Sequence, residues 1–227
     1  MLWQGAAGSE LQGQGEPGPG VNPVGGMPAT DDEIREKYLE RAIRELNHFT
    51  RELQSCDRCP RGNLMPVLGS GHPQADVLML KYAPMPSEIE EGVAFYGRSG
   101  SALMKSFKRL NIDPLAVYGT VVVKCPVHDT DLAAPECKAR VLDELAVVQP
   151  RIVVVMGEEA CEELNALQVP LAAQVTTTPG GIQKLTASCD ALYVPDIDAS
   201  LDDERAKRAF WSAFRSLGDW YADFPPY

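Results

Sequence analysis

Four short apolar runs, separated by stretches with helical periodicity, restrict the fold of this 227-residue sequence more than any other feature. The runs lie at residues 77–80, 117–123, 152–156 and 191–194. Continuous runs rich in Val and Ile are typical of strands buried on both faces, and intervening helices make such strands parallel. We therefore predict a three-layer α/β/α domain with a mainly parallel central sheet of about four strands.

The first predicted helix has a clear start signal. Thr30 and Glu33 have the spacing of a capping box, and apolar residues recur at helical spacing from Ile34 to Leu53. Four further helical patterns lie at about residues 100–110, 135–148, 158–167 and 202–221. Residues 1–29 are rich in Gly, Gln and Pro without apolar periodicity, so we expect a disordered tail there and one domain over residues 30–227.

The charge of the chain limits its partners. It has 32 acidic and 21 basic residues, a formal net charge of -11, so the molecule as a whole repels nucleic acid and anionic membranes. One stretch is basic: between Gly92 and Ile112 lie Arg98, Lys105, Lys108 and Arg109 and no acid. This stretch is either a DNA contact or a solvated helix face.

The sequence carries no sign of a membrane protein. No apolar run approaches the ~20 residues that cross a bilayer, and the start of the chain lacks the basic-then-apolar order of a signal peptide. We expect a cytoplasmic protein without membrane contact, and a monomer.

The cysteines form a second constellation. Cys56 and Cys59 make a C-x-x-C motif at the end of the first helix, Cys125 closes a predicted strand, and Cys137 opens a predicted helix. Strand ends gather at one edge of an open α/β sheet, so the four could converge. Four thiolates suit zinc or an iron-sulfur cluster, and spacing does not choose between them. The other interpretation is that Cys56 and Cys59 are an incidental pair and that Cys125 and Cys137 are small core residues.

Three segments together resemble one enzyme family. Residues 92–100 (GVAFYGRSG) resemble the G-x-P-F-x-G-x-A-G stretch of the iron-sulfur uracil-DNA glycosylases, usually called family 4. Residues 122–125 (VVKC) and residues 150–164 resemble two further family segments in the same order. The resemblance implies a uracil-DNA-glycosylase-like fold with a 4Fe-4S cluster on Cys56, Cys59, Cys125 and Cys137. The loop from 125 to 137 is shorter than the family's.

The resemblance also assigns substrate-binding positions. Phe95 falls at the family's stacking aromatic, with a core Phe as the other interpretation. Gly97 and Arg98 follow in the same segment, where Arg98 and the start of a helix could meet a phosphate.

Three positions depart from the family pattern. Tyr82 replaces the carboxylate that helps activate water, Val121 replaces the Asn that reads the uracil edge, and Asp198 replaces the His that stabilises the departing base. In addition, five of the residues from 196 to 204 are acidic, which opposes contact with phosphates.

These departures predict a protein that keeps the fold and cluster but lacks ordinary uracil excision. One alternative is an active DNA glycosylase in base excision repair with an altered substrate, using for example Asp196 or Asp198 as its acid. Another is a structural metal-binding protein that no longer binds DNA.

Overall fold

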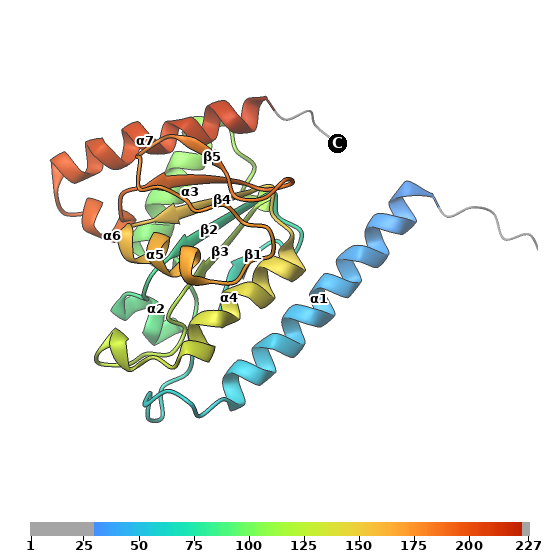
Figure 1. Ribbon diagram of the computed structural model, residues 1–227, viewed down its shortest axis with the longest axis vertical. Helices are drawn as coiled ribbons and strands as arrows, with labels where there is room; N and C mark the ends of the chain where they lie inside the picture. Colours follow the sequence, from blue (N-terminus) through green and yellow to red (C-terminus); the bar gives the residue numbers. More distant parts are fainter. Residues whose placement is uncertain (1–29, 224–227) are drawn as a thin grey trace, which may run out of the picture.

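A single mixed sheet between two helical layers forms the centre of the computed structural model, which describes residues 30–223 (Figure 1). The strand order is β1-β3-β2-β4-β6-β5. The four central strands are parallel: β2 (Val77–Lys81), β3 (Val117–Val121), β4 (Ile152–Met156) and β6 (Asp190–Val194). This confirms the predicted α/β fold. The tail expected over residues 1–29 lies outside the described residues.

Two short edge strands were not predicted. β1 (Ser70–Gly71) and β5 (Ile182–Lys184) pair antiparallel with β3 and β6. The expected count of about four strands is therefore too low. Strands of two and three residues are too short to show a periodic pattern in the sequence.

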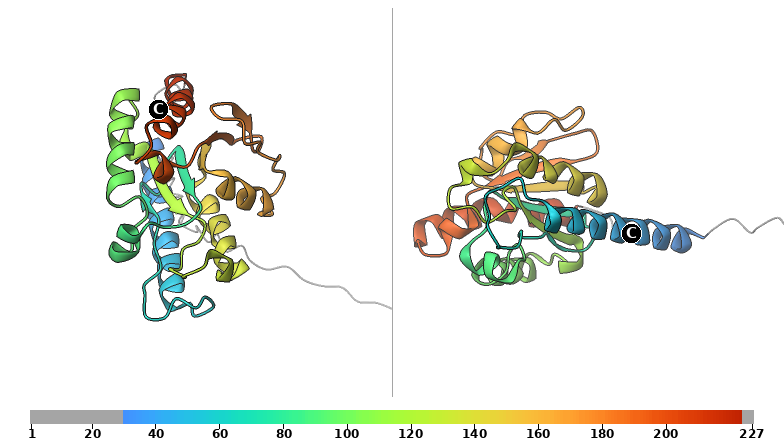
Figure 2. Two further views of the ribbon diagram at one scale, coloured as in Figure 1. Left: turned by 90° about the vertical axis from the view of Figure 1, so that its left-hand side faces the viewer. Right: turned by 90° about the horizontal axis from the view of Figure 1, so that it is seen from below.

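Helices cover both faces of the sheet (Figure 2). On one side lie α3 (Arg98–Leu110) and α7 (Glu204–Ala222), and on the other α4 (Pro135–Val148) and α5 (Glu158–Ala166). Alternate residues of each strand feed two separate buried clusters: Val154 packs toward α3 and α7, whereas Val153 and Val155 pack toward α4 and α5. Burial on both faces explains why the strands read as continuous apolar runs.

The first helix, α1 (Asp31–Ser55), begins at the predicted capping box. The Glu33 amide donates to Thr30 Oγ1 at 3.3 Å, and the Thr30 amide donates to Glu33 Oε2 at 2.8 Å. The C-terminal part of α1 lies beside α4, while its N-terminal part extends away from the domain (Figure 1). Tyr38, on the apolar stripe of the helix, is 58% exposed for this reason.

Two short helices, α2 (Pro86–Glu91) and α6 (Ile197–Ser200), follow β2 and β6 at the carboxyl edge of the sheet. One-turn helices η1 (Pro114–Ala116) and η2 (Thr130–Leu132) lie in loops. The described part of the chain contains no helix long and apolar enough to cross a membrane.

Candidate functional site

Buried charges meet at the carboxyl edge of the sheet. Lys81, the last residue of β2, has its Nζ 2.6 Å from Glu88 Oε2 and 2.6 Å from Asp198 Oδ2. Glu88 comes from α2 and Asp198 from α6, so three elements contribute. Lys81 is 2% exposed and Glu88 is fully buried. We call Lys81, Glu88 and Asp198 the Lys81 triad.

The two carboxylates of the triad differ in their other contacts. Glu88 also accepts hydrogen bonds from the backbone amides of Met85 and Phe95. Asp198 Oδ1 is buried and has no hydrogen-bond partner within residues 30–223. Buried charges are tolerated only when paired and hydrogen-bonded, so Lys81 is required to hold both carboxylates in place.

Phe95 lies directly beside the triad. Lys81 Nζ is over its ring, 5.4 Å from the centroid, in a cation-π contact. The ring also packs against Gly119, where a Cβ would approach Phe95 Cδ2 to 2.5 Å. Phe95 has a φ of 58°, a conformation that is rare for an aromatic residue. The ring face toward Lys81 is therefore occupied by an ammonium group.

The three positions that depart from the family pattern, 82, 121 and 198, do not lie together. Val121 is fully buried in an apolar cluster with Val67 and Ala94, against which Phe95 packs. Asp198 belongs to the Lys81 triad. Tyr82 instead packs toward the α4 side of the sheet, with Lys138 Nζ 5.7 Å from its ring centroid. The structure thus places Val121 and Asp198 near Phe95 and directs Tyr82 elsewhere.

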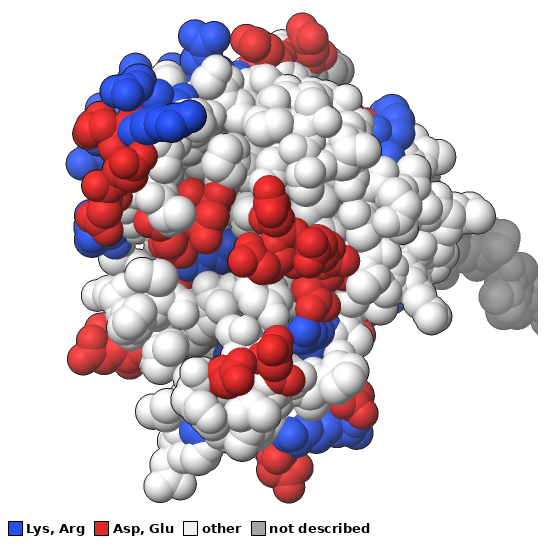
Figure 3. Space-filling view, turned by 60° about the vertical axis from the view of Figure 1, so that its left-hand side comes forward, with Lys and Arg blue, Asp and Glu red and all other residues white. Residues whose placement is uncertain are grey.

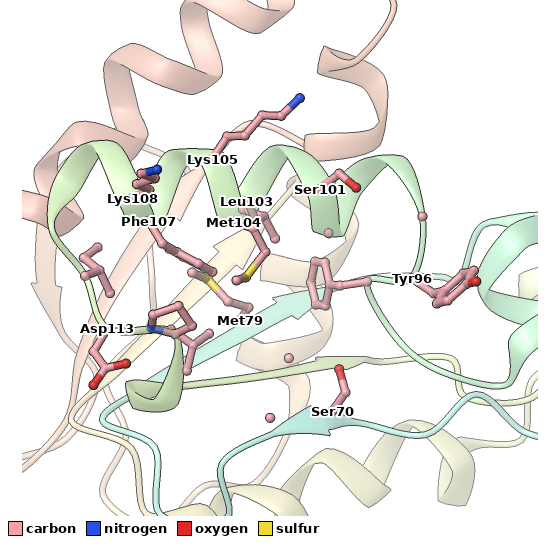
Figure 4. A pocket seen from close by; sticks show the side chains of 18 of the residues that line it. Ser70, Met79, Tyr96, Ser101, Leu103, Met104, Lys105, Phe107, Lys108 and Asp113 are labelled. Carbon is pink, nitrogen blue, oxygen red and sulfur yellow. The ribbon is translucent and has the colours of Figure 1, made fainter.

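A cavity of about 1070 Å³ extends from Phe95 along α3 (Figure 4). Its walls are mainly apolar, with Met79, Leu103 and Phe107 pointing into it from the strand and the helix. Tyr82, Val121 and Asp198 are not among its lining residues. The cavity is therefore separate from the Lys81 triad.

Further acids surround the triad. Burial and the charge of Asp198 raise the pKa of Asp196, the N-cap of α6. Burial and the nearby carboxylates of Glu158, Glu159 and Asp196 raise the pKa of Tyr193 on β6. Figure 3 shows acidic side chains gathered on this face. Such a face repels phosphates.

The basic stretch and the acidic loop are in contact. Arg98, in the first turn of α3, has its Nη2 2.5 Å from Asp202 Oδ1, and both side chains are largely exposed. This partner holds the pKa of Asp202 below its usual value. Gly97, with a φ of 87°, forms the turn that leads into α3. The charge of Arg98 is thus partly neutralised in the free protein.

Three of the four predicted ligand cysteines converge. The sulfur atoms of Cys59, Cys125 and Cys137 all lie within 4.8 Å of one another, and all three residues are buried. A hydrogen bond from the Cys125 thiol, with others from backbone amides, lowers the pKa of Cys137 to about 5. The same thiol hydrogen bond, together with burial, strongly raises the pKa of Cys125. A sulfur set that stabilises a thiolate suits a soft metal centre.

Cys56 stands outside this group. It is the C-cap of α1, is partly exposed, and lines a cavity of about 330 Å³ together with Cys125 and Cys137. Cys161 and Cys189 are buried elsewhere, where each thiol donates to a backbone carbonyl. The three converging cysteines fit a metal site, and Cys56 lines the cavity that Cys125 and Cys137 also line.

A buried network that was not predicted from the sequence lies next to these cysteines. Lys124 Nζ lies 2.6 Å from Glu144 Oε2, and both side chains are fully buried. Thr120 and Tyr118 also donate to Glu144. Two sequence signals could have indicated this network. Lys124 ends an apolar run, and Glu144 lies on the apolar face of the predicted helix over residues 135–148.

Comparisons with known proteins agree on one family. The family model described as the uracil DNA glycosylase superfamily matches residues 68–215. A type-4 uracil-DNA glycosylase of Sulfurisphaera tokodaii is 30% identical over 124 residues, which cover 51% of this chain and 56% of the relative. That of Pyrobaculum aerophilum is 30% identical over 131 residues, 54% of this chain and 66% of the relative. That of Archaeoglobus fulgidus is 27% identical over 128 residues, 53% and 63%. The chain spans less than two thirds of each relative's length.

Proposed function

The chain belongs to the uracil-DNA glycosylase superfamily, and we propose that it keeps the family's DNA contact and a 4Fe-4S cluster but lacks ordinary uracil excision. Excision requires a flipped base stacked on an aromatic ring, a group that reads the uracil edge, and stabilisation of the departing base anion. The observation that carries the proposal is the Lys81 triad, which places an ammonium over Phe95 and a carboxylate at Asp198.

Each of these groups opposes a step of excision. Lys81 Nζ lies over one face of the aromatic ring to which the family resemblance assigns base stacking. Val121 offers no hydrogen-bond donor or acceptor to a pyrimidine. Asp198, already paired with Lys81, puts a carboxylate at the position where the family resemblance implies the His that stabilises the leaving anion.

The test is an excision assay with uracil in single-stranded and double-stranded DNA, using anaerobically purified protein. We expect no abasic sites above the protein-free background. Robust turnover would contradict the proposal, and turnover that survives both Phe95→Ala and Asp198→Ala would show that the residue assignments are wrong as well.

The metal site is proposed to use Cys59, Cys125 and Cys137 with Cys56 as the fourth ligand. A bound cluster would supply structural cross-linking, because its ligands come from the end of α1, the segment after β3 and the start of α4. Brown colour and absorbance near ~400 nm, lost in Cys59→Ser but kept in Cys161→Ser, are expected. Stoichiometric zinc in a colourless sample would support the zinc alternative instead.

A second candidate function rests on Asp196. Asp196 is a partly buried carboxyl group at the carboxyl edge of the sheet, and burial raises its pKa. An acid in this position would suit a glycosylase for another damaged base. A panel of oligonucleotides that carry different deaminated and alkylated bases tests this alternative. Excision of one of these bases that is lost in Asp196→Asn would establish it, and inactivity on the whole panel would exclude those substrates.

A further inference from the structure

Basic side chains from two helices line one groove. The groove between α3 and α7 has a volume of about 820 Å³, and among its described lining residues Glu204 is the only acid. Figure 3 shows Lys and Arg gathered in this region, at the upper left, beside a row of acids. The basic lining residues are Arg98, Lys105 and Arg109 of α3 and Lys207 and Arg208 of α7. On a chain of net charge -11 this is a local concentration of positive charge.

Helical spacing aligns these groups. Lys105 and Arg109 are one turn apart on α3, and Arg208 and Trp211 are nearly one turn apart on α7. Trp211 is partly buried, and the Arg109 guanidinium lies 4.3 Å from the centroid of its ring. The groove therefore combines an aromatic surface with cations.

Several of these cations are available to a ligand. Lys105 and Arg208 have no acidic partner within 4 Å among residues 30–223, and both are exposed. Arg98 and Lys207 pair with Asp202 and Glu204 at the surface. Exposed ion pairs contribute little, so phosphates can replace these carboxylates.

We propose that the α3–α7 groove binds single-stranded DNA, with phosphates at Lys105 and Arg208 and one base stacked on the Arg109 guanidinium that lies over Trp211. A basic groove with an aromatic side chain is the combination that binds single strands, because unpaired bases expose their faces. From Arg98 to Arg109 the helix extends about 16 Å, enough for several phosphates. This inference rests on the DNA contact of the proposed function. It places that contact in the α3–α7 groove, away from the acids at the carboxyl edge of the sheet.

Fluorescence anisotropy with a labelled 15-nucleotide single strand, titrated with salt from 50 mM, tests the groove. We expect Lys105→Glu/Arg208→Glu to weaken binding about tenfold or more and to reduce the salt slope by about 1.4, as for two lost phosphate contacts. Lys37→Glu/Arg44→Glu makes the same change of charge on exposed positions of α1 and should alter affinity less than about twofold.

A second variant acts in the opposite direction. Asp202→Asn removes an acid from the edge of the groove and releases Arg98, so binding should tighten about two- to threefold. Wild-type affinity in both groove variants would contradict DNA binding in the groove, but it would not contradict the DNA contact of the proposed function. No binding at 50 mM salt would overturn both. Displacement by polyglutamate as effective as by unlabelled DNA would overturn the choice of nucleic acid.

Discussion

Lys81 joins two acidic side chains that come from different helices at the end of β2. Its 2.6 Å contacts to Glu88 and Asp198 are shielded from water, so each charge depends on the others. A single substitution at this residue changes both the packing over Phe95 and the charge balance of the strand ends.

Lys81→Met is therefore expected to destabilise the fold by about 3–5 kcal/mol, because it leaves buried carboxylates without a cation. Chemical denaturation measures the difference. The matched control is Lys184→Met, which breaks an ion pair whose lysine is 71% exposed and should cost less than about 1 kcal/mol. Equal losses in the two variants would contradict the structural role of Lys81.

A combined variant tests the account of missing excision chemistry. The family resemblance implies Gly at position 81 as well as Glu, Asn and His at positions 82, 121 and 198. The combined variant Lys81→Gly, Tyr82→Glu, Val121→Asn and Asp198→His restores all four residue types. We expect uracil excision at least about tenfold above background, while the triple variant that keeps Lys81 stays inactive because the ammonium still lies over Phe95. A folded, inactive combined variant would show that other positions also separate this chain from active enzymes.

The elements α1, β3 and α4 meet at the cysteine group. Three buried sulfurs lie beside the Lys124–Glu144 pair, so a metal there would fasten the end of α1 to the sheet. The C-terminal half of α1 otherwise buries only Phe49 and Leu53.

Cys137→Ser is expected to lower the melting temperature by several degrees and to speed hydrogen exchange near the end of α1, because a lost metal ligand loosens this junction. Cys189→Ser, a buried cysteine outside the group, is the control for the hydrogen-exchange pattern. Unchanged exchange in α1 after Cys137→Ser would contradict the cross-linking role.

Asp196, the N-cap of α6, is expected to make the stability of the fold depend on pH. The folded-state pKa of Asp196 is raised, so its ionised form is disfavoured by folding, and stability falls as pH rises from 3.8 through the raised value. Asp196→Asn removes this loss and can still cap the helix. The stability of the variant minus that of the wild type should therefore increase over this pH range in denaturation experiments. A constant difference would contradict the burial of this carboxylate.

At the scale of the whole molecule, charge is distributed unevenly. Acids cover the carboxyl edge of the sheet, whereas bases of α3 and α7 gather beside them (Figure 3). Long-range repulsion from the acids opposes the approach of any polyanion to the groove.

Glu158→Lys/Glu159→Lys reverses two of these charges in exposed positions at the start of α5. At 50 mM salt we expect single-stranded DNA to bind several times faster, and the gain to disappear at 500 mM because salt screens distant charges. Stopped-flow association rates at the two salt concentrations provide the measurement. A gain that persists at high salt would indicate a direct contact instead.

Local patterns in the sequence determined much of the fold. Apolar runs predicted the four parallel strands, and Thr30 with Glu33 predicted the start of α1, because these signals depend on neighbours a few residues away. The short helices and the edge strands were not predicted, because elements of so few residues show no hydrophobic periodicity in the sequence. Family motifs likewise marked the segments around Phe95 and Cys125.

Only the tertiary structure decided what those segments do together. Lys81 and Asp198 are 117 residues apart in the chain, and Arg98 and Asp202 are 104 apart, so no local pattern relates them. Strand order brings the ends of β2 and β6 to one edge, on either side of β4, and packing of α7 beside α3 adds a second row of cations to the groove. Charges interact through space over a few ångströms, and the folded chain alone sets those distances.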